Sequence, residues 1–122
     1  MKTTLIGLLL IAGCYAGPAK FHEIGENYVR DVHDCSDMSW EWIDHLIATG
    51  TDPDDLRYMS GERMTKIFDD RLRTGQYHAW VARWDGGVWV YDDPMKGWYG
   101  MEKWIYDQEF GPRTSLPVRQ TP

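Results

Sequence analysis

The longest amphipathic pattern in the chain runs from Asp34 to Gly50. Apolar side chains recur there every three or four residues, which is the period of a helix with one buried face. Asp34 is a good N-cap, Asp37 can complete a capping box with it, and Gly50 lies where a left-handed C′ residue is wanted. We therefore predict a helix whose first turn contains Cys35. Its apolar face comprises Cys35, Met38, Ser39, Trp42, Ile43, Leu46 and Ile47.

The strongest β pattern is a pair of aromatic and β-branched segments, 76–84 and 88–91, around a turn signal at Gly86-Gly87. A two-residue loop pairs Trp84 with Trp89 and makes His78 a diagonal neighbour of Asp93 on one face. A three-residue loop makes Asp92 the neighbour instead. We favour Asp93, because the glycine pair fits a tight primed turn. With this register, one face carries His78, Trp80, Ala82 and Trp84 beside Trp89, Tyr91 and Asp93.

Weaker patterns fill the rest of the chain. We expect a short helix or turn in 22–32, a short strand over 56–60 that stops at Gly61, and an amphipathic helix over 62–75. Segment 101–110 suits a last helix or an edge strand, and 111–122, with three prolines and few apolar residues, suits a flexible tail. The predicted fold class is α+β: one helix packed on a short antiparallel sheet.

The N-terminal segment has the pattern of an export signal. One lysine precedes an apolar run over 5–13, which is too short to span a bilayer and resembles the hydrophobic region of a signal peptide. Ile11-Ala12-Gly13-Cys14 resembles a lipobox, so we expect residues 1–13 to be removed and Cys14 to be lipidated. There are two alternatives. The chain could be cleaved near Cys14-Tyr15-Ala16 for ordinary secretion, or the apolar run over 5–13 could be a buried helix of the fold. Residues 14–21 then form a tether, 22–110 the folded domain and 111–122 the tail.

Composition limits the partners. The 13 basic and 19 acidic residues give a net charge of −6, which argues against a nucleic-acid binder. The chain contains two cysteines, so lipidation of Cys14 leaves Cys35 as the free thiol and no intramolecular disulfide. We expect an exported monomer that is anchored to the cell membrane by its N-terminal lipid, or a secreted one.

The position of Cys35 has two readings. The first turn of a helix has unpaired N–H groups and the positive end of the dipole, which favour a thiolate. A cysteine on an apolar face is also an ordinary small buried side chain. Catalysis by a thiol needs three groups: the thiol as nucleophile, an imidazole as its base and a carboxylate that orients the imidazole. The sequence offers a thiol at a helix start, an imidazole on a later strand and a carboxylate on the next strand. The candidates for these roles are Cys35, His78 and Asp93, with Asp92 as the alternative carboxylate.

Three local patterns over residues 28–95 resemble the transglutaminase-like (papain-related) cysteine peptidase superfamily, especially its bacterial cysteine proteinases. They are Asp34-Cys35-Ser36-Asp37 at a helix start, Gly50 followed by 56–61, and 77–81 followed by 89–94, which ends in Asp-Asp-Pro. The resemblance implies a small papain-like core and a Cys-His-Asp triad that needs no cofactor. It implies a hydrolase or acyl transferase acting on peptide, isopeptide or peptidoglycan-stem amides through a thioester.

The resemblance leaves two parts of the site open. Asn27 or Tyr28, upstream of the cysteine, are candidates for a second oxyanion donor beside the Cys35 N–H. Candidates for a groove that holds an extended substrate are Trp80, Trp84, Trp89 and Tyr91.

Two other functions fit parts of the sequence. A zinc site with His33, Cys35 and His78 would ordinarily show paired Cys/His ligands at short spacing, and the chain has none, so we expect no metal. A catalytically inactive transglutaminase-like surface domain that binds a peptide or protein partner is the main alternative. It predicts a buried and unreactive Cys35.

Overall fold

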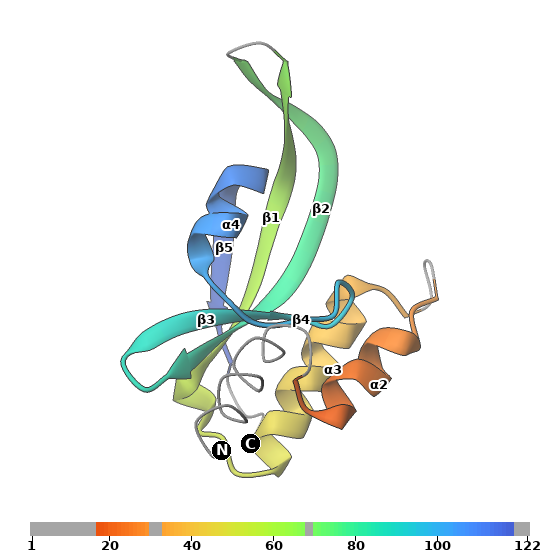
Figure 1. Cartoon of the computed structure of the whole chain (residues 1–122), viewed down its shortest axis with the longest axis vertical. Coiled ribbons are helices and arrows are strands. Elements are labelled where there is room, and N and C mark those ends of the chain that lie inside the picture. The colour runs from red at the N-terminus through yellow and green to blue at the C-terminus, as the bar shows by residue number, and fades with distance from the viewer. Residues whose placement is uncertain (1–16, 30–32, 68–69, 119–122) are drawn as a thin grey trace, which may run out of the picture.

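The computed structural model describes residues 17–29, 33–67 and 70–118, so the predicted signal peptide and Cys14 lie outside the described residues. An antiparallel sheet of five strands, in the order β4-β3-β2-β1-β5, forms the centre of the fold (Figure 1). This arrangement confirms the α+β class. In the described part of the chain, no helix has the length and apolar content to cross a membrane. The strands are β1 (Leu56–Ile67), β2 (Asp70–Asp85), β3 (Val88–Asp93), β4 (Trp98–Met101) and β5 (Phe110–Pro117).

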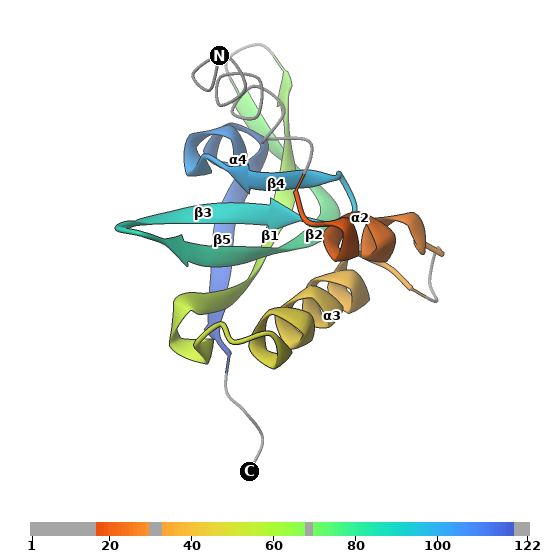
Figure 2. The ribbon, with the colours of Figure 1, turned by 60° about the horizontal axis from the view of Figure 1, so that its bottom comes forward.

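Helices cover both faces of the sheet. Helices α2 (Ala19–Glu26) and α3 (Cys35–Ala48) lie together on one side, and α4 (Lys103–Glu109) lies on the other (Figure 2). The alternation of side chains along β2 separates two apolar clusters, because Val81 faces α3 whereas Trp80 faces α4. The first cluster contains Phe21, Ile24, Met38, Trp42, Ile43, Leu46, Leu56, Val81 and Val118, and the second Met59, Trp80, Ala82, Tyr91, Tyr106 and Phe110.

Helix α3 begins where the sequence predicts. The Asp34 side chain accepts hydrogen bonds from the N–H groups of Ser36 (3.1 Å) and Asp37 (3.3 Å), and the Asp37 carboxylate accepts one from the Asp34 N–H (3.2 Å). This capping box fixes Cys35 as the first helical residue. The helix ends before Gly50, whose φ of 110° confirms the predicted C′ position.

The hairpin register is also confirmed. Trp84 pairs with Trp89, Val81 pairs with Asp92, and both loop residues, Gly86 and Gly87, have positive φ. Asp92 and Asp93 therefore point to opposite faces of the sheet at the end of β3.

The predicted helix over 62–75 is wrong, because the segment belongs to the long hairpin of β1 and β2, where Met64 pairs with Arg73. Gly61 does not stop the strand either. It lies opposite His78 within the ladder, and a Cβ there would come within 3.3 Å of both the Trp80 and Phe110 side chains. The glycine therefore allows close packing across the sheet, and strand pairing outweighs the helical spacing of the local apolar residues.

Both predicted flexible ends are partly wrong as well. Segment 110–117 forms edge strand β5 paired with β1, where prolines are tolerated because one side of an edge strand needs no ladder donor. Helix α2 occupies part of the predicted tether, and its Phe21 is fully buried. A Cβ on Gly25 of α2 would lie 2.2 Å from the Pro94 carbonyl oxygen, so this glycine lets α2 contact the turn that follows Asp93.

Candidate active site

The first turn of α3 and the middle of β2 bring Cys35 and His78 into contact. The Cys35 thiol is half-buried, and it interacts with the His78 ring and the Ala79 backbone N–H closely enough for both groups to lower its pKa against the effect of burial. Since α3 packs mainly against β2, the capping box that fixes the start of the helix also fixes the sulfur beside this strand.

His78 is bound on its other side by Asp93. The His78 Nε2 lies 2.6 Å from Asp93 Oδ2, and the Asp93 side chain is fully buried. Nδ1 is then the ring nitrogen that remains for the thiol. Two further groups hold the carboxylate: Tyr106 Oη donates to Oδ2 at 2.7 Å, and the Lys96 backbone N–H donates to Oδ1 at 3.3 Å. The His78 ring packs beside the Trp80 and Phe110 rings, whose centroids are 5.9 and 5.8 Å from it.

These contacts favour a charged pair of side chains. Burial opposes the protonated form of His78, but its hydrogen bonds with Asp93 and Cys35 outweigh burial and raise the pKa of His78 to about 9. Burial opposes the charged form of Cys35 too, and by itself it would raise the pKa of the thiol. The interactions with His78 and the Ala79 N–H more than offset burial, so the net effect is a lowered pKa of the Cys35 thiol. Both shifts favour a thiolate beside an imidazolium, which is the reactive form of a thiol nucleophile.

Asp92 has a different role from its neighbour. Its carboxylate accepts hydrogen bonds from Trp42 Nε1 (3.0 Å), from Arg83 Nε (2.8 Å) and Nη2 (3.1 Å), and from the Gly100 N–H (2.9 Å). Asp92 is fully buried and joins α3, β2 and β4, but it makes no contact with His78 among the contacts of the described residues. The structure therefore brings Asp93, the carboxylate that the register favours, to the imidazole.

A second histidine, His33, lies just before α3 and contacts two polar groups. His33 Nδ1 lies 2.9 Å from the Asn27 carbonyl oxygen, and His33 Nε2 lies 2.8 Å from Glu41 Oε2. Both partners are acceptors, so both ring nitrogens donate only when the ring is protonated. The hydrogen bond to Glu41 raises the pKa of His33, and burial opposes it only in part.

The oxyanion candidates have unequal support. Cys35 is the first residue of α3, so its N–H has no acceptor within the helix and is free to donate to a substrate oxyanion. Asn27 and Tyr28 are exposed, and no contact between either side chain and Cys35 is found among the described residues. A second oxyanion donor from these two residues remains a prediction.

The predicted aromatic groove is wrong for two of its four residues. Trp80 and Tyr91 are 0% and 2% exposed, because they form the core between the sheet and α4. Trp84 is exposed at the β2–β3 end, and Trp89 lies beside it. A separate pocket of about 190 Å³ adjoins His78 instead. It is lined by Arg63, Gln76, Tyr77, His78, Met95, Lys96, Glu109 and Phe110.

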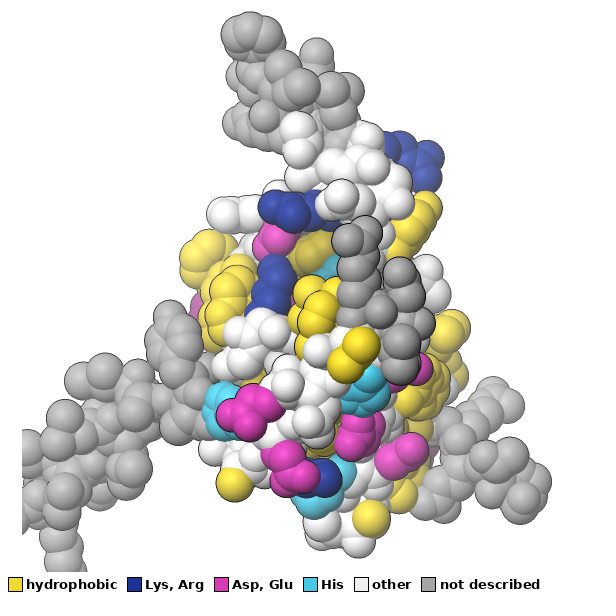
Figure 3. Space-filling model, turned by 90° about the vertical axis from the view of Figure 1, so that its right-hand side faces the viewer, with side chains coloured by type: hydrophobic (Ala, Val, Ile, Leu, Met, Phe, Trp, Pro, Cys, Tyr) yellow, Lys and Arg dark blue, Asp and Glu magenta, His cyan; other side chains and the backbone are white. Residues whose placement is uncertain are grey.

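The face that carries α2 and α3 is acidic. Asp, Glu and His side chains gather over these helices, whereas Lys and Arg lie mainly over the β1–β2 end of the molecule (Figure 3). Asp34 and Asp37, at the start of α3, are the acidic groups that flank Cys35 in the sequence. A neutral or basic substrate would therefore meet less repulsion at this face than an acidic one.

Some features of the site have no clear sequence signal. Tyr106 reaches Asp93 only because α4 packs across the sheet, and the His33–Glu41 pair joins a residue before α3 to one within it. Within residues 17–29, 33–67 and 70–118, no group of three or more His, Cys, Asp or Glu side chains is placed to hold a metal ion.

Comparison of the chain with models of protein families, with curated proteins and with solved structures finds no match.

Proposed function

We propose that the protein is a cysteine hydrolase or acyl transferase acting on amides, with a core of the papain/transglutaminase type. The observation that supports the proposal is the shared imidazole: His78 Nε2 lies 2.6 Å from Asp93 Oδ2, and the interaction of the same ring with Cys35 helps to lower the pKa of the half-buried thiol against the effect of burial. The helix start supplies the nucleophile, the strand supplies the base, and a buried carboxylate sets the orientation of the ring.

Acylation follows from this geometry. The Cys35 thiolate attacks the amide carbonyl carbon and forms a C–S bond, while the Cys35 N–H donates to the developing oxyanion. The His78 imidazolium then gives its Nδ1 proton to the leaving nitrogen, the C–N bond breaks, and an amine departs from a thioester.

Deacylation reverses the proton transfer. Neutral His78 takes a proton from water or from an incoming amine, which attacks the thioester carbonyl and displaces the thiolate. Water gives hydrolysis and an amine gives transfer. The pocket beside His78 is the nearest place for a substrate side chain, and the acidic face over α2 and α3 favours neutral or basic peptides, including peptidoglycan-stem amides with free amines.

The test is labelling of Cys35 by a peptide-amide electrophile that reacts with thiolates. We expect Cys35→Ala to abolish labelling and His78→Asn to reduce it at least about tenfold at pH 7, both with unchanged circular dichroism. Hydrolysis of a fluorogenic peptide amide is measured in parallel, with and without an added amine that would reveal transfer.

Two results would contradict the proposal. Equal labelling in wild type and Cys35→Ala would remove Cys35 as the nucleophile. Reaction of the wild-type thiol only after denaturation would favour the alternative, a domain that binds a partner without catalysis.

We also propose that the enzyme works outside the cell on a lipid anchor at Cys14. The support is the sequence of residues 1–14, which lie outside the described residues. Mass measurement of the protein from the membrane fraction of its host tests this: a chain that begins at Cys14 and carries acyl groups is expected, and an unmodified residue 1 would contradict it.

A further inference from the structure

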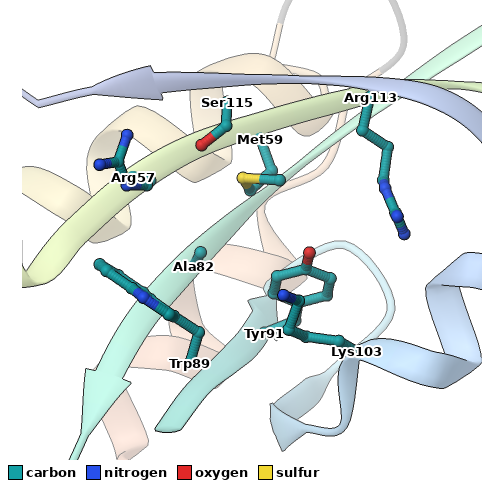
Figure 4. A pocket seen from close by; sticks show the side chains of 8 residues that line it. All are labelled: Arg57, Met59, Ala82, Trp89, Tyr91, Lys103, Arg113 and Ser115. Carbon is teal, nitrogen blue, oxygen red and sulfur yellow. The ribbon is translucent and has the colours of Figure 1, made fainter.

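A second pocket lies on the α4 side of the sheet, away from Cys35. It has a volume of about 320 Å³, near the lower end of the range for small-molecule sites. Its side chains come from β1, β2, β3, β5 and α4, and they converge on one space (Figure 4). They are Arg57, Met59, Ala82, Trp89, Tyr91, Lys103, Arg113 and Ser115.

Positive charge is concentrated in this pocket, although the whole chain has a net charge of −6. Arg57, Lys103 and Arg113 come from three different elements. Arg113 pairs with Asp107, but the salt bridges of the described residues include neither Arg57 nor Lys103. Three cations with one carboxylate leave two positive charges uncompensated, so the pocket is suited to a dianion.

Apart from Ser115, the other side chains that line the pocket are apolar or aromatic. Met59 and Ala82 are buried at its base, and the Arg57 guanidinium lies over the Trp89 ring, 5.7 Å from the centroid. The Tyr91 side chain is almost fully buried. Burial raises the pKa of its hydroxyl, and the nearby Arg113 opposes this only in part. The hydroxyl therefore stays protonated and can donate a hydrogen bond. A flat ring fits against such walls, and an anionic group fits against the cations.

We propose that this pocket binds a small phosphate monoester carried on a flat ring. A phosphate monoester has a charge of about −2 at neutral pH, which matches the two uncompensated charges, and arginine binds its oxygens in a bidentate manner. A carboxylate would leave one positive charge unmatched.

The site is separate from the candidate active site. Ala82 is four residues beyond His78 along β2, which is about 13 Å at the rise of a strand. The Trp80 and Tyr106 side chains fill the core between them. The proposal therefore does not depend on the proposed chemistry of Cys35.

The experiment is calorimetric titration of the full chain with phenyl phosphate. Inorganic phosphate lacks the ring, benzoate carries one charge, and phenol carries none. We expect phenyl phosphate to bind at least about tenfold more tightly than each of these. Arg57→Gln and Lys103→Gln should each weaken binding about tenfold, whereas Lys20→Gln, which removes an equal charge from the exposed α2, should leave it unchanged.

A second readout locates the ligand. The indole N–H resonance of Trp89, assigned from its loss in Trp89→Phe, should shift on addition of phenyl phosphate, and in Arg57→Gln the same shift should need about tenfold more ligand. Adenosine monophosphate and O-phosphotyrosine are then compared. Binding of either one supports the proposal, and the tighter one identifies the kind of ring.

Three results would overturn the proposal. They are the absence of saturable binding of phenyl phosphate below about 10 mM, equal binding of benzoate, and equal weakening by Lys20→Gln. Circular dichroism of each variant shows that it is folded, and binding by Cys35→Ser at wild-type strength is expected because the two sites are separate.

Discussion

The Asp93→Asn substitution tests the electrostatic basis of the candidate active site, since it removes the charge behind His78 but keeps the shape of the side chain. The pKa of His78 is raised from 6.5 to about 9, and Asp93 makes the larger of the two favourable contributions. A difference of that size corresponds to about 3 kcal/mol in favour of the imidazolium. Because this imidazolium stabilises the Cys35 thiolate, the pKa of the thiol should rise toward its ordinary value when Asp93 loses its charge.

The assay is the rate at which iodoacetamide alkylates Cys35 between pH 5 and pH 10, followed by mass spectrometry on the peptide that contains it. Loss of one charge-assisted hydrogen bond, about 1.5–3 kcal/mol, predicts a rate at pH 7 that is at least about tenfold lower in Asp93→Asn. The midpoint of the profile should move to higher pH. Tyr106→Phe, which removes one hydrogen bond to the carboxylate but keeps its charge, should have a smaller effect.

The reasoning would be refuted by identical pH profiles for wild type and Asp93→Asn in folded protein. It would also be refuted if Tyr106→Phe shifted the profile more than Asp93→Asn, because the charge of the carboxylate would then not be the main cause.

Three further predictions concern stability. Asp92→Asn breaks the buried ion pair with Arg83 and should lower the free energy of unfolding by about 3 kcal/mol, as measured by thermal unfolding. In the folded variant, the pH profile of Cys35 alkylation should not shift. Gly61→Ala would raise the free energy of unfolding by about 0.4–1 kcal/mol if the added methyl group had room. Contact of that methyl group with Phe110 predicts instead a loss of about 1–3 kcal/mol. The sign of the change in Tm therefore tests the packing. Glu41→Gln should lower Tm more at pH 5.5 than at pH 8.5. Because the pKa of His33 is raised in the fold, its charged form stabilises the fold fully below pH 6.5. This stabilisation is lost as the pH rises through the raised pKa. An equal change in Tm at both pH values would contradict this reasoning.

The predictable parts of the fold are those fixed by residues close in the sequence. The start of α3 follows from a capping box within four residues, and the β2–β3 register follows from two glycines in the turn. That register was enough to predict the contact of His78 with Asp93 across the hairpin.

The parts that sequence reasoning missed depend on contacts between distant segments. The apolar spacing in 62–75 is compatible with a helix, and only pairing with β2 and β5 makes Leu56–Ile67 one strand. Segment 110–117 lacks a β pattern of its own and becomes ordered because β1 offers it an unpaired edge. Trp80 and Tyr91 were predicted to face a substrate because the alternation pattern does not show that α4 covers that face.

The adjacency of Asp92 and Asp93 has a consequence for comparing related chains. One carboxylate holds helix and strands together, its immediate neighbour serves the imidazole, and a single peptide bond separates them. If the proposed chemistry holds, a related chain that lost it while keeping the fold could vary the position of Asp93 but not that of Asp92. Under the proposed function, the residues at positions 92 and 93 would therefore distinguish relatives that keep the chemistry from relatives that keep only the fold.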